Sequence, residues 1–415
     1  MECSCRKFLG VPAFGGEFLG VPAFLVESSY RKFLGVEMDA SDLRLHRARL
    51  DVLHHSQQRE ASDMKAKLVG IDLAKNVFQV CVIAFNGSVL FNKKFSRNKF
   101  LEWLKDLEPT TVALEACGTG HFWGRKLQAA GHIVRLIPAQ HVKAFCRVHK
   151  NDKGDALAIT EAAQRPKMHF VPVKTLGQQD LQLLGRVRSK LVSQRTELIS
   201  QVRGLAGEYG VTFPVSRAAF MTGLPLALED ADNGLTRLAR FALRNALEDI
   251  RALDTRLAAL ATQTAAAAKQ EPAYERLLTV PGFGPVVAPA FIAAVGNGQQ
   301  FEHGRDVSAW LGIVPKQQGT GGKVQLMRIS KNGDRELRTL LIHGARAVLR
   351  WVDRRDDPMS RWLLSLRARR GEARAIVALA NKLARIGWAV LRGDKDFDVT
   401  KAFRPKAIKP QPAAA

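Results

Sequence analysis

The chain of 415 residues has few cysteines, few acidic residues and no long apolar run. Its five cysteines, at positions 3, 5, 81, 117 and 146, form no CxxC pair and no His/Cys ligand spacing. That pattern supports neither a disulfide framework nor a structural zinc site, and it favours a reducing cytoplasm. No apolar stretch approaches the roughly 20 residues that span a membrane. Because only 39 acidic residues oppose 63 lysines and arginines, the net charge of +24 indicates a polyanionic partner, with nucleic acid ahead of a membrane surface.

The length and the 46% hydrophobic content predict more than one core. The phrase Phe-Leu-Gly-Val recurs at 8–11, 18–21 and 33–36, so we expect residues 1–63 to be a disordered or artefactual extension and Met64 to be the natural start. The rest of the chain is predicted to divide into an α/β domain at 64–175, a helical hairpin at 176–270, a helical domain at 271–393 and a flexible tail at 394–415.

The first of these domains shows hairpin-connected strands followed by helix-strand pairs. Asn86-Gly87 between two apolar runs is a strong hairpin signal. This order predicts a mixed sheet with helices on its faces, the architecture of ribonuclease-H-like nucleases. The expected strands are 68–72, 77–84, 89–95, 111–115 and 133–137, and the expected helices are 100–107 and 122–130.

Apolar residues recur at spacings of three, four and seven between about 181 and 260. Such a stripe predicts a coiled-coil-like helical hairpin, either packed within the chain or shared between subunits. Residues 275–392 are predicted to be helical at both ends and glycine-rich between 319 and 333. The fold class is therefore α/β plus all-α.

Four acidic residues fall where strands end or a helix begins. Asp72 ends the first strand, Glu115 ends the fourth, and Asp152 and Asp155 open a helix after the fifth. Alone, each could be a turn cap or an acid favoured by the helix dipole. Together they predict a Mg²⁺ (or Mn²⁺) site, because phosphodiester cleavage uses divalent cations, carboxylates are the hard ligands these ions prefer, and a cation relieves repulsion among the acids.

Two later segments combine glycine with positive charge. Residues 278–285 look like a helix-hairpin-helix loop in which Gly282 and Gly284 hold a phosphate, although a plain Pro-Gly turn explains them equally well. Residues 319–338 bring glycines and hydroxyls together with dense basic charge, which suits a transferring phosphoryl group better than a solvated basic loop does. The nucleic-acid ligands predicted there are Lys323, Arg328, Lys331, Arg335 and Arg338.

Three short segments carry a family resemblance: Gly-Ile-Asp-Leu-Ala-Lys at 70–75, Leu-Glu-Ala-Cys-Gly-Thr-Gly at 114–120 and Lys-Asn-Asp-Lys-Gly-Asp-Ala at 150–156. They resemble the Asp-Glu-Asp-Asp transposases of bacterial insertion sequences, also called bridge-RNA-guided recombinases. The resemblance extends from Met64 to about Gly393. It implies a Holliday-junction-resolvase-like first domain that binds Mg²⁺ at the four acids. It also implies a guide RNA, and a homo-oligomer, dimer or tetramer, that acts on element ends and target DNA.

In that family a serine of the second domain attacks the scissile phosphate and becomes joined to DNA. Its members usually show Ser and then Ser or Thr before Gly-Gly-Lys, whereas this chain has Gly319 and then Thr320. Either Thr320 has taken over as nucleophile, or Ser330 serves, or the protein is catalytically impaired. We therefore expect a cytoplasmic, nucleoid-associated transposase. The alternatives are a junction nuclease that uses water and a nucleic-acid-binding protein with vestigial acids.

Overall fold

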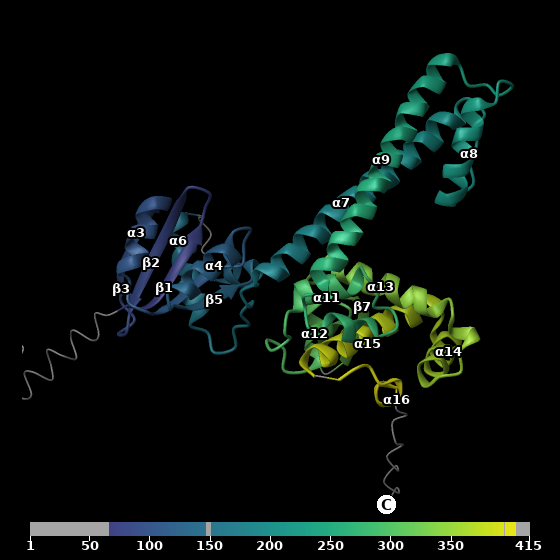
Figure 1. Ribbon diagram of the computed structural model, residues 1–415. Coiled ribbons are helices and arrows are strands. Elements are labelled where there is room, and N and C mark those ends of the chain that lie inside the picture. Colours follow the sequence, from purple (N-terminus) through teal and green to yellow (C-terminus); the bar gives the residue numbers. More distant parts are fainter. Residues whose placement is uncertain (1–65, 147–150, 322, 394, 404–415) are drawn as a thin grey trace, which may run out of the picture. The chain divides into compact units, whose positions relative to one another are not determined.

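The computed structural model describes residues 66–146, 151–321, 323–393 and 395–403 (Figure 1). The repeated segment 1–63, the expected start at Met64 and most of the expected tail lie outside these residues. Within them, no helix combines the length and the apolar character that crossing a membrane requires.

A five-stranded mixed sheet has the strand order β3-β2-β1-β4-β5. Strands β1, β4 and β5 run parallel, with Ile71 opposite Leu114 and Glu115 opposite Ile137. All five strands and both helices confirm the predicted elements to within a few residues. Their bounds are β1 Ala66–Leu73, β2 Val77–Ala84, β3 Val89–Ser96, α3 Arg97–Asp106, β4 Thr111–Glu115, α4 Gly120–Ala129 and β5 Ile133–Ile137.

The predicted turn between β2 and β3 forms at Asn86-Gly87. Gly87 has a φ of 86°, a left-handed conformation that glycine adopts without steric cost. The Asn86 side-chain oxygen accepts a hydrogen bond from the backbone N–H of Ser88 at 2.9 Å. The local sequence therefore determines this turn without help from distant residues.

Two hydrophobic clusters hold helices to the sheet. The rings of Phe78, Phe100 and Trp123 meet edge to face, with centroids 4.9 to 5.4 Å apart, and so join β2, α3 and α4. Helix α6 (Asp152–Ala163) buries Ile159 and its small neighbours among residues of β1, β4 and β5. Between β5 and α6 lie a short helix, α5 (Ala139–Val142), and a 3₁₀ turn, η1 (Lys143–Phe145).

Two helices of 32 residues each, α7 (Leu176–Gly207) and α9 (Arg237–Ala268), lie side by side (Figure 1). A capping box begins α7, since the Thr175 hydroxyl accepts from the Gln178 N–H at 3.1 Å and the Gln178 side chain accepts from Thr175 N–H. The expected helical hairpin is present. The sequence did not predict a further helix between its arms, α8 (Arg217–Glu229).

The C-terminal helices enclose a separate core that includes Phe283, Phe291, Leu341 and Leu383. Their bounds are α10 Tyr274–Leu278, α11 Val287–Val295, α12 Gly304–Trp310, α13 Arg335–Leu349, η2 Val352–Arg354, α14 Pro358–Arg370, α15 Glu372–Arg392 and α16 Val399–Ala402. Where a glycine-rich stretch was expected, the chain forms an antiparallel hairpin of β6 (Pro315–Thr320) and β7 (Lys323–Ile329).

Candidate active site

The register of two parallel strands brings the first two acids together. Ile71 of β1 lies opposite Leu114 of β4, so Asp72 and Glu115 follow as neighbours one step further along. Both are at the carboxyl ends of their strands and both are partly exposed. In-register neighbours in a parallel sheet direct their side chains to the same face. Asp72 and Glu115 therefore share one edge and one face of the sheet.

A close approach of α6 to β1 carries Asp155 toward the same edge. A Cβ at Gly70 would lie 2.3 Å from the Thr160 methyl carbon and 2.9 Å from the Ala156 carbonyl oxygen. Only glycine leaves room for the helix backbone at this distance. Ala156 follows Asp155 in the chain, and Gly70 precedes Asp72 by two residues. The packing thus brings the first turn of α6 close to the end of β1, and no sequence pattern indicated it.

Contacts from β3 hold the first turn of α6. The Lys94 ammonium lies 2.7 Å from the Asp152 carboxylate. The Asn92 side-chain amide donates to the Lys153 carbonyl at 2.9 Å and accepts from the buried Gln79 amide at 2.5 Å. The Asn151 side chain caps the helix by accepting from the Gly154 N–H at 2.6 Å. The sequence analysis did not predict the roles of Asn92 and Lys94, because no pattern in β3 indicates a contact with residues about 60 positions later in the chain.

The four acids have the carboxylate chemistry that a divalent cation prefers, and the backbone brings their strand ends and the first turn of α6 near one another. Their side chains, however, do not converge on one point. Among the described residues, no three His, Cys, Asp or Glu side chains stand close enough together to hold a metal ion. Asp152 pairs with Lys94, and the Cys146 thiol lies 3.6 Å from an Asp155 oxygen. Closing a cation site would require the carboxylates to turn toward one another.

A partly buried histidine lies near the loop that follows Glu115. His121 is the second residue of α4, and its Nδ1 accepts from the Lys174 N–H at 3.2 Å. Burial lowers the pKa of His121 to about 4, and the positive charges of Lys174 and Arg125 add to that shift. His121 is therefore neutral at physiological pH and serves as a hydrogen-bond acceptor, not as a cation.

The β6–β7 hairpin places Thr320 next to its tip. Thr320 pairs with Lys323, Gly319 with Val324 and Gln318 with Gln325. Because side chains alternate between faces, positions 318, 323 and 325 share one face and 319, 324 and 326 the other. The first face is polar and basic. On the second, Val324 and Leu326 are 66% and 64% exposed.

Ser330 lies at the base of the hairpin in a tightly packed segment. The Ser330 N–H donates to the Val314 carbonyl at 2.8 Å, and its hydroxyl accepts from the Asn332 N–H at 3.4 Å. The segment is left-handed at Lys331, with φ 58°, and at Gly333, where a Cβ would overlap the Trp310 carbonyl oxygen. Ser330 does not cap the next helix, because Asp334 caps α13 by accepting from the Leu337 N–H at 2.9 Å.

The predicted nucleic-acid ligands fall into exposed and buried positions. Arg338 is buried, and its guanidinium donates to the Leu311 and Asn332 carbonyls at 2.9 and 2.8 Å, so its contacts hold the Ser330 segment in place. Gly282 has a φ of 93° and packs against Gly344 of α13, whereas a Cβ at Gly284 would meet open space. The remaining four are exposed: Lys323, Arg328, Lys331 and Arg335.

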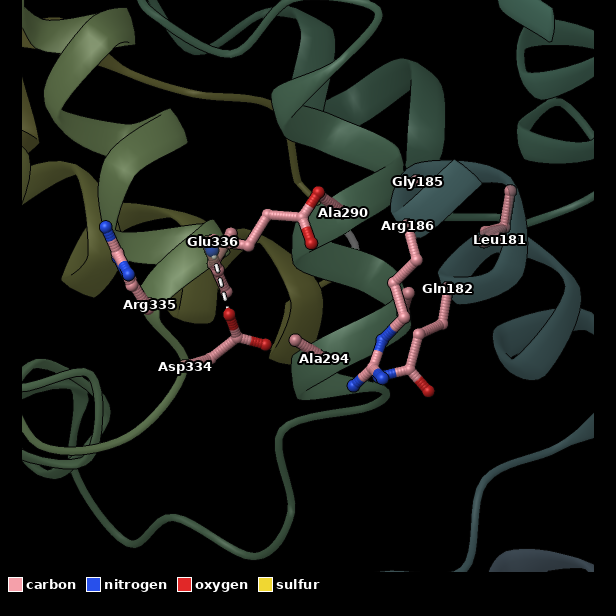
Figure 2. Close-up of a pocket in the computed structure, with 11 residues that line it drawn as sticks. Leu181, Gln182, Gly185, Arg186, Ala290, Ala294, Asp334, Arg335 and Glu336 are labelled. Atoms are coloured by element: carbon pink, nitrogen blue, oxygen red, sulfur yellow. Dashed lines mark hydrogen bonds between the residues drawn. The ribbon is translucent and has the colours of Figure 1, made fainter. Parts of the chain in front are cut away.

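A pocket of about 430 Å³ lies between α7, α11 and the start of α13 (Figure 2). Burial raises the pKa of Glu336, as does the Asp334 carboxylate, whereas Arg186 and the Ser189 hydroxyl oppose the shift. In Figure 2, Arg335 extends away from the labelled α7 side chains. Nothing in the sequence pattern indicated that Glu336 lies near Arg186 and Ser189, because α7 and α13 are about 150 residues apart in the chain.

Comparison with known proteins finds one family model that matches the region of the four acids and another that matches the region of the hairpin. Residues 69–210, which carry all four acids, match a family model for Asp-Glu-Asp-Asp IS110 transposases, described as "Transposase". Residues 274–360, which carry Gly282, the β6–β7 hairpin and α13, match a second family model, described as "Transposase IS116/IS110/IS902 family".

Full-length relatives agree with these matches. A protein named as a probable family 20 transposase of Pseudomonas aeruginosa is 44% identical over 79% of this chain and 97% of its own length. The transposase for insertion sequence element IS1111A of Coxiella burnetii is 40% identical over 82% of this chain and 94% of its own. The transposase for insertion sequence element IS1328 of Yersinia enterocolitica is 36% identical over 78% and 96%. The chain belongs to the IS110/IS116 family of insertion-sequence transposases.

Proposed function

We propose that this protein cuts and rejoins DNA strands at the ends of a bacterial insertion sequence and at its target. The observation that carries the proposal is the shared sheet edge: Asp72 and Glu115 directly follow the paired residues Ile71 and Leu114, and the close approach at Gly70 brings the first turn of α6, which carries Asp155, near the end of β1. The strand order, with its three parallel strands, fits the ribonuclease-H-like architecture predicted from the sequence. The net charge of +24 fits a DNA substrate and a guide RNA, which the family resemblance implies.

Asp72, Glu115 and Asp155 would hold Mg²⁺ or Mn²⁺, and Asp152 would join them after leaving Lys94. When bound, the cation supplies charge stabilisation for the phosphate oxygens and for the departing strand. Lys94 would then be released from its ion pair and could contact a DNA phosphate. Cys146 keeps one Asp155 oxygen engaged until that residue turns toward the others.

The hydroxyl of Thr320 is our proposed nucleophile. It attacks the scissile phosphorus, loses its proton and forms a phosphodiester bond to the protein. The bond from phosphorus to the leaving strand breaks, and that strand's oxygen takes up a proton. Lys323, the cross-strand partner of Thr320, offers positive charge beside the reacting phosphate. Ser330 is the second choice, and a homo-oligomer in the nucleoid-containing cytoplasm is the proposed working form.

Alanine substitution of the acids tests the metal site. Asp72→Ala and Glu115→Ala should abolish strand cleavage in Mg²⁺ or Mn²⁺ and leave DNA affinity within about twofold, because backbone contacts use other residues. Asp106→Ala removes an exposed acid of α3, and this control should cleave normally. Normal cleavage by both Asp72→Ala and Glu115→Ala would refute the site.

A covalent protein–DNA adduct tests the nucleophile and separates the rival functions. An adduct trapped on denaturing gels supports a transposase, whereas cleavage without an adduct supports a junction nuclease that uses water. Binding without cleavage supports a protein with vestigial acids. Thr320→Ala should abolish the adduct, and an adduct that persists would move the role to Ser330. If Gly319→Ser raises recombination from near zero, the natural chain has lost its nucleophile.

A further inference from the structure

Helix α13 has one buried face and one basic face. Leu337, Leu341, Ala345 and Leu349 are buried, and α13 packs against α11 and α15. The exposed positions follow at spacings of four, four, three and four, which form one stripe on a helix. Over 15 residues such a stripe runs about 22 Å. It contains no carboxylate, and its members are Arg335, Thr339, His343, Arg346 and Arg350.

The arginines of this stripe keep their charge available. Within the described part of the chain, Arg335, Arg346 and Arg350 make no ion pair. Arginines of the neighbouring α14 differ, since Arg361 pairs with Asp356 at 2.8 Å and Arg367 pairs with Asp353 at 2.5 Å. The stripe is thus an unneutralised cationic surface, not a network of surface ion pairs.

An exposed tryptophan directly follows the last arginine of the stripe in the chain. Trp351 is 53% exposed, and the Arg354 guanidinium lies 4.9 Å from the ring centroid. Trp388 differs, because its indole N–H donates to the Gly298 carbonyl at 3.0 Å within the helical core. An aromatic ring with an adjacent guanidinium is a surface on which an unpaired base can stack.

The carboxylates next to Trp351 do not cancel this surface. Asp353 and Asp356 pair with the α14 arginines, and Asp357 caps α14 by accepting from the Met359 and Ser360 N–H groups at 2.9 Å each. All three therefore already have an arginine or a backbone N–H group as a partner. At its other end α13 joins the Ser330 segment, to which the buried Arg338 ties it.

We infer that the exposed face of α13 binds a nucleic-acid strand, with Arg346 and Arg350 on phosphates and an unpaired base stacked on Trp351. The inference rests on the proposed function and assigns it a binding surface. The strand leaves the region of the nucleophile hairpin and follows α13 toward Trp351. The occupant is unpaired DNA near the cut, because α13 begins at the base of the hairpin that carries the proposed nucleophile. A single-stranded RNA offers the same chemistry, a phosphate backbone with a free base, and is an alternative outcome of the test.

Binding measurements test the surface without relying on catalysis. The probes are a labelled single-stranded DNA of about 20 nucleotides, the RNA of the same sequence and the duplex DNA, each titrated by fluorescence anisotropy over a range of KCl. Trp351→Ala should weaken binding to single strands about 5- to 150-fold, the typical loss of one stacked base. Trp351→Phe should lose less than about threefold, and duplex binding should hardly change.

The arginines give a second readout. Arg346→Ala/Arg350→Ala should lower the slope of log K against log[KCl] for single strands by about 1.4, since each phosphate contact contributes about 0.7. Arg256→Ala removes an exposed arginine of α9, and this control should leave the slope unchanged. Circular dichroism confirms that every variant is folded. The single-stranded DNA should lose more affinity than the RNA, and a larger loss for the RNA would overturn DNA as the occupant.

Two outcomes would overturn the inference. Folded Trp351→Ala and Arg346→Ala/Arg350→Ala variants that bind both single strands like the wild type would exclude this surface. So would variants that lose binding only to polyglutamate, an acidic-polypeptide probe. Cleavage retained by Asp72→Ala bears on the proposed function alone, so the two failures remain distinguishable.

Discussion

Gly70→Ala should destabilise the protein because it separates α6 from β1. The new methyl group would lie 2.3 Å from the Thr160 methyl carbon, 2.9 Å from the Ala156 carbonyl oxygen and 3.2 Å from the Thr160 nitrogen. Overpacking of a core costs about 1–3 kcal/mol, and two backbone atoms among the contacts favour the upper end. Alanine regains about 0.5–1 kcal/mol of the conformational cost of glycine in a strand. The expected net loss is about 2 kcal/mol.

A second substitution separates the methyl contact from the backbone contacts. Thr160→Ser removes the methyl carbon and keeps the hydroxyl, which donates to the Leu157 carbonyl at 2.6 Å. In urea titrations, Gly70→Ala/Thr160→Ser should therefore be more stable than the sum of its single changes by about 1 kcal/mol. Gly118→Ala, where no atom lies within 4 Å, is the matched control. A loss below about 0.5 kcal/mol for Gly70→Ala, together with additive effects, would refute the close approach.

Three further changes test other parts of the structure. The pKa of His121 is lowered from its ordinary value of 6.5 to about 4 in the folded protein, so its stability contribution is present above pH 6.5 and falls as the pH drops toward 4. His121→Gln should remove at most about 2 kcal/mol of that acid sensitivity in urea titrations at about pH 7.5 and 5, and the exposed His169→Gln should not. The pKa of Glu336 is raised in the folded protein, so the stability of the protein is unaffected by this group below its unfolded pKa and falls as the pH rises through its folded pKa. Glu336→Gln should therefore raise the Tm at about pH 7.5 and leave it unchanged at about pH 4. Arg338→Met should lower the unfolding free energy by about 1–3 kcal/mol, because the buried Leu311 carbonyl and the Asn332 carbonyl lose their donor; an unchanged Tm would restore Arg338 as a candidate phosphate ligand.

The strands of the sheet could be predicted because local chemistry determines them. Residues 77–84 form one apolar run, residues 111–115 another, and Asn86-Gly87 closes the turn between β2 and β3. The end positions of the strands then placed Asp72 and Glu115 at one edge without any knowledge of side-chain contacts. Strands and turns of this kind depend on residues that are close together in the chain, and so they can be predicted from the sequence alone.

The contacts that arrange the candidate site could not be predicted in the same way. Lys94 meets Asp152 across about 58 residues of chain, and nothing near Lys94 indicates a carboxylate partner. The sequence predicted Arg338 as one more phosphate ligand of a basic stretch. In the structure its guanidinium is buried and donates hydrogen bonds to two backbone carbonyl groups. The hairpin was missed because both of its faces meet solvent, so β7 lacks the alternation of buried and exposed residues that marks a strand.

The two proposed nucleophiles lie in different parts of the hairpin, Thr320 next to its tip and Ser330 at its base. A two-stranded ribbon without a core is only marginally stable, so the tip gains little order from the protein itself. The base is different: Gly312, Lys331 and Gly333 adopt left-handed conformations, and a Cβ at Gly333 would lie 1.9 Å from the Trp310 carbonyl oxygen. Ser330 therefore lies, partly exposed, in a segment whose backbone is held in place by this packing. Thr320 belongs to an exposed ribbon that bound DNA could order, and for this physical reason Thr320 is the first proposed nucleophile and Ser330 the second.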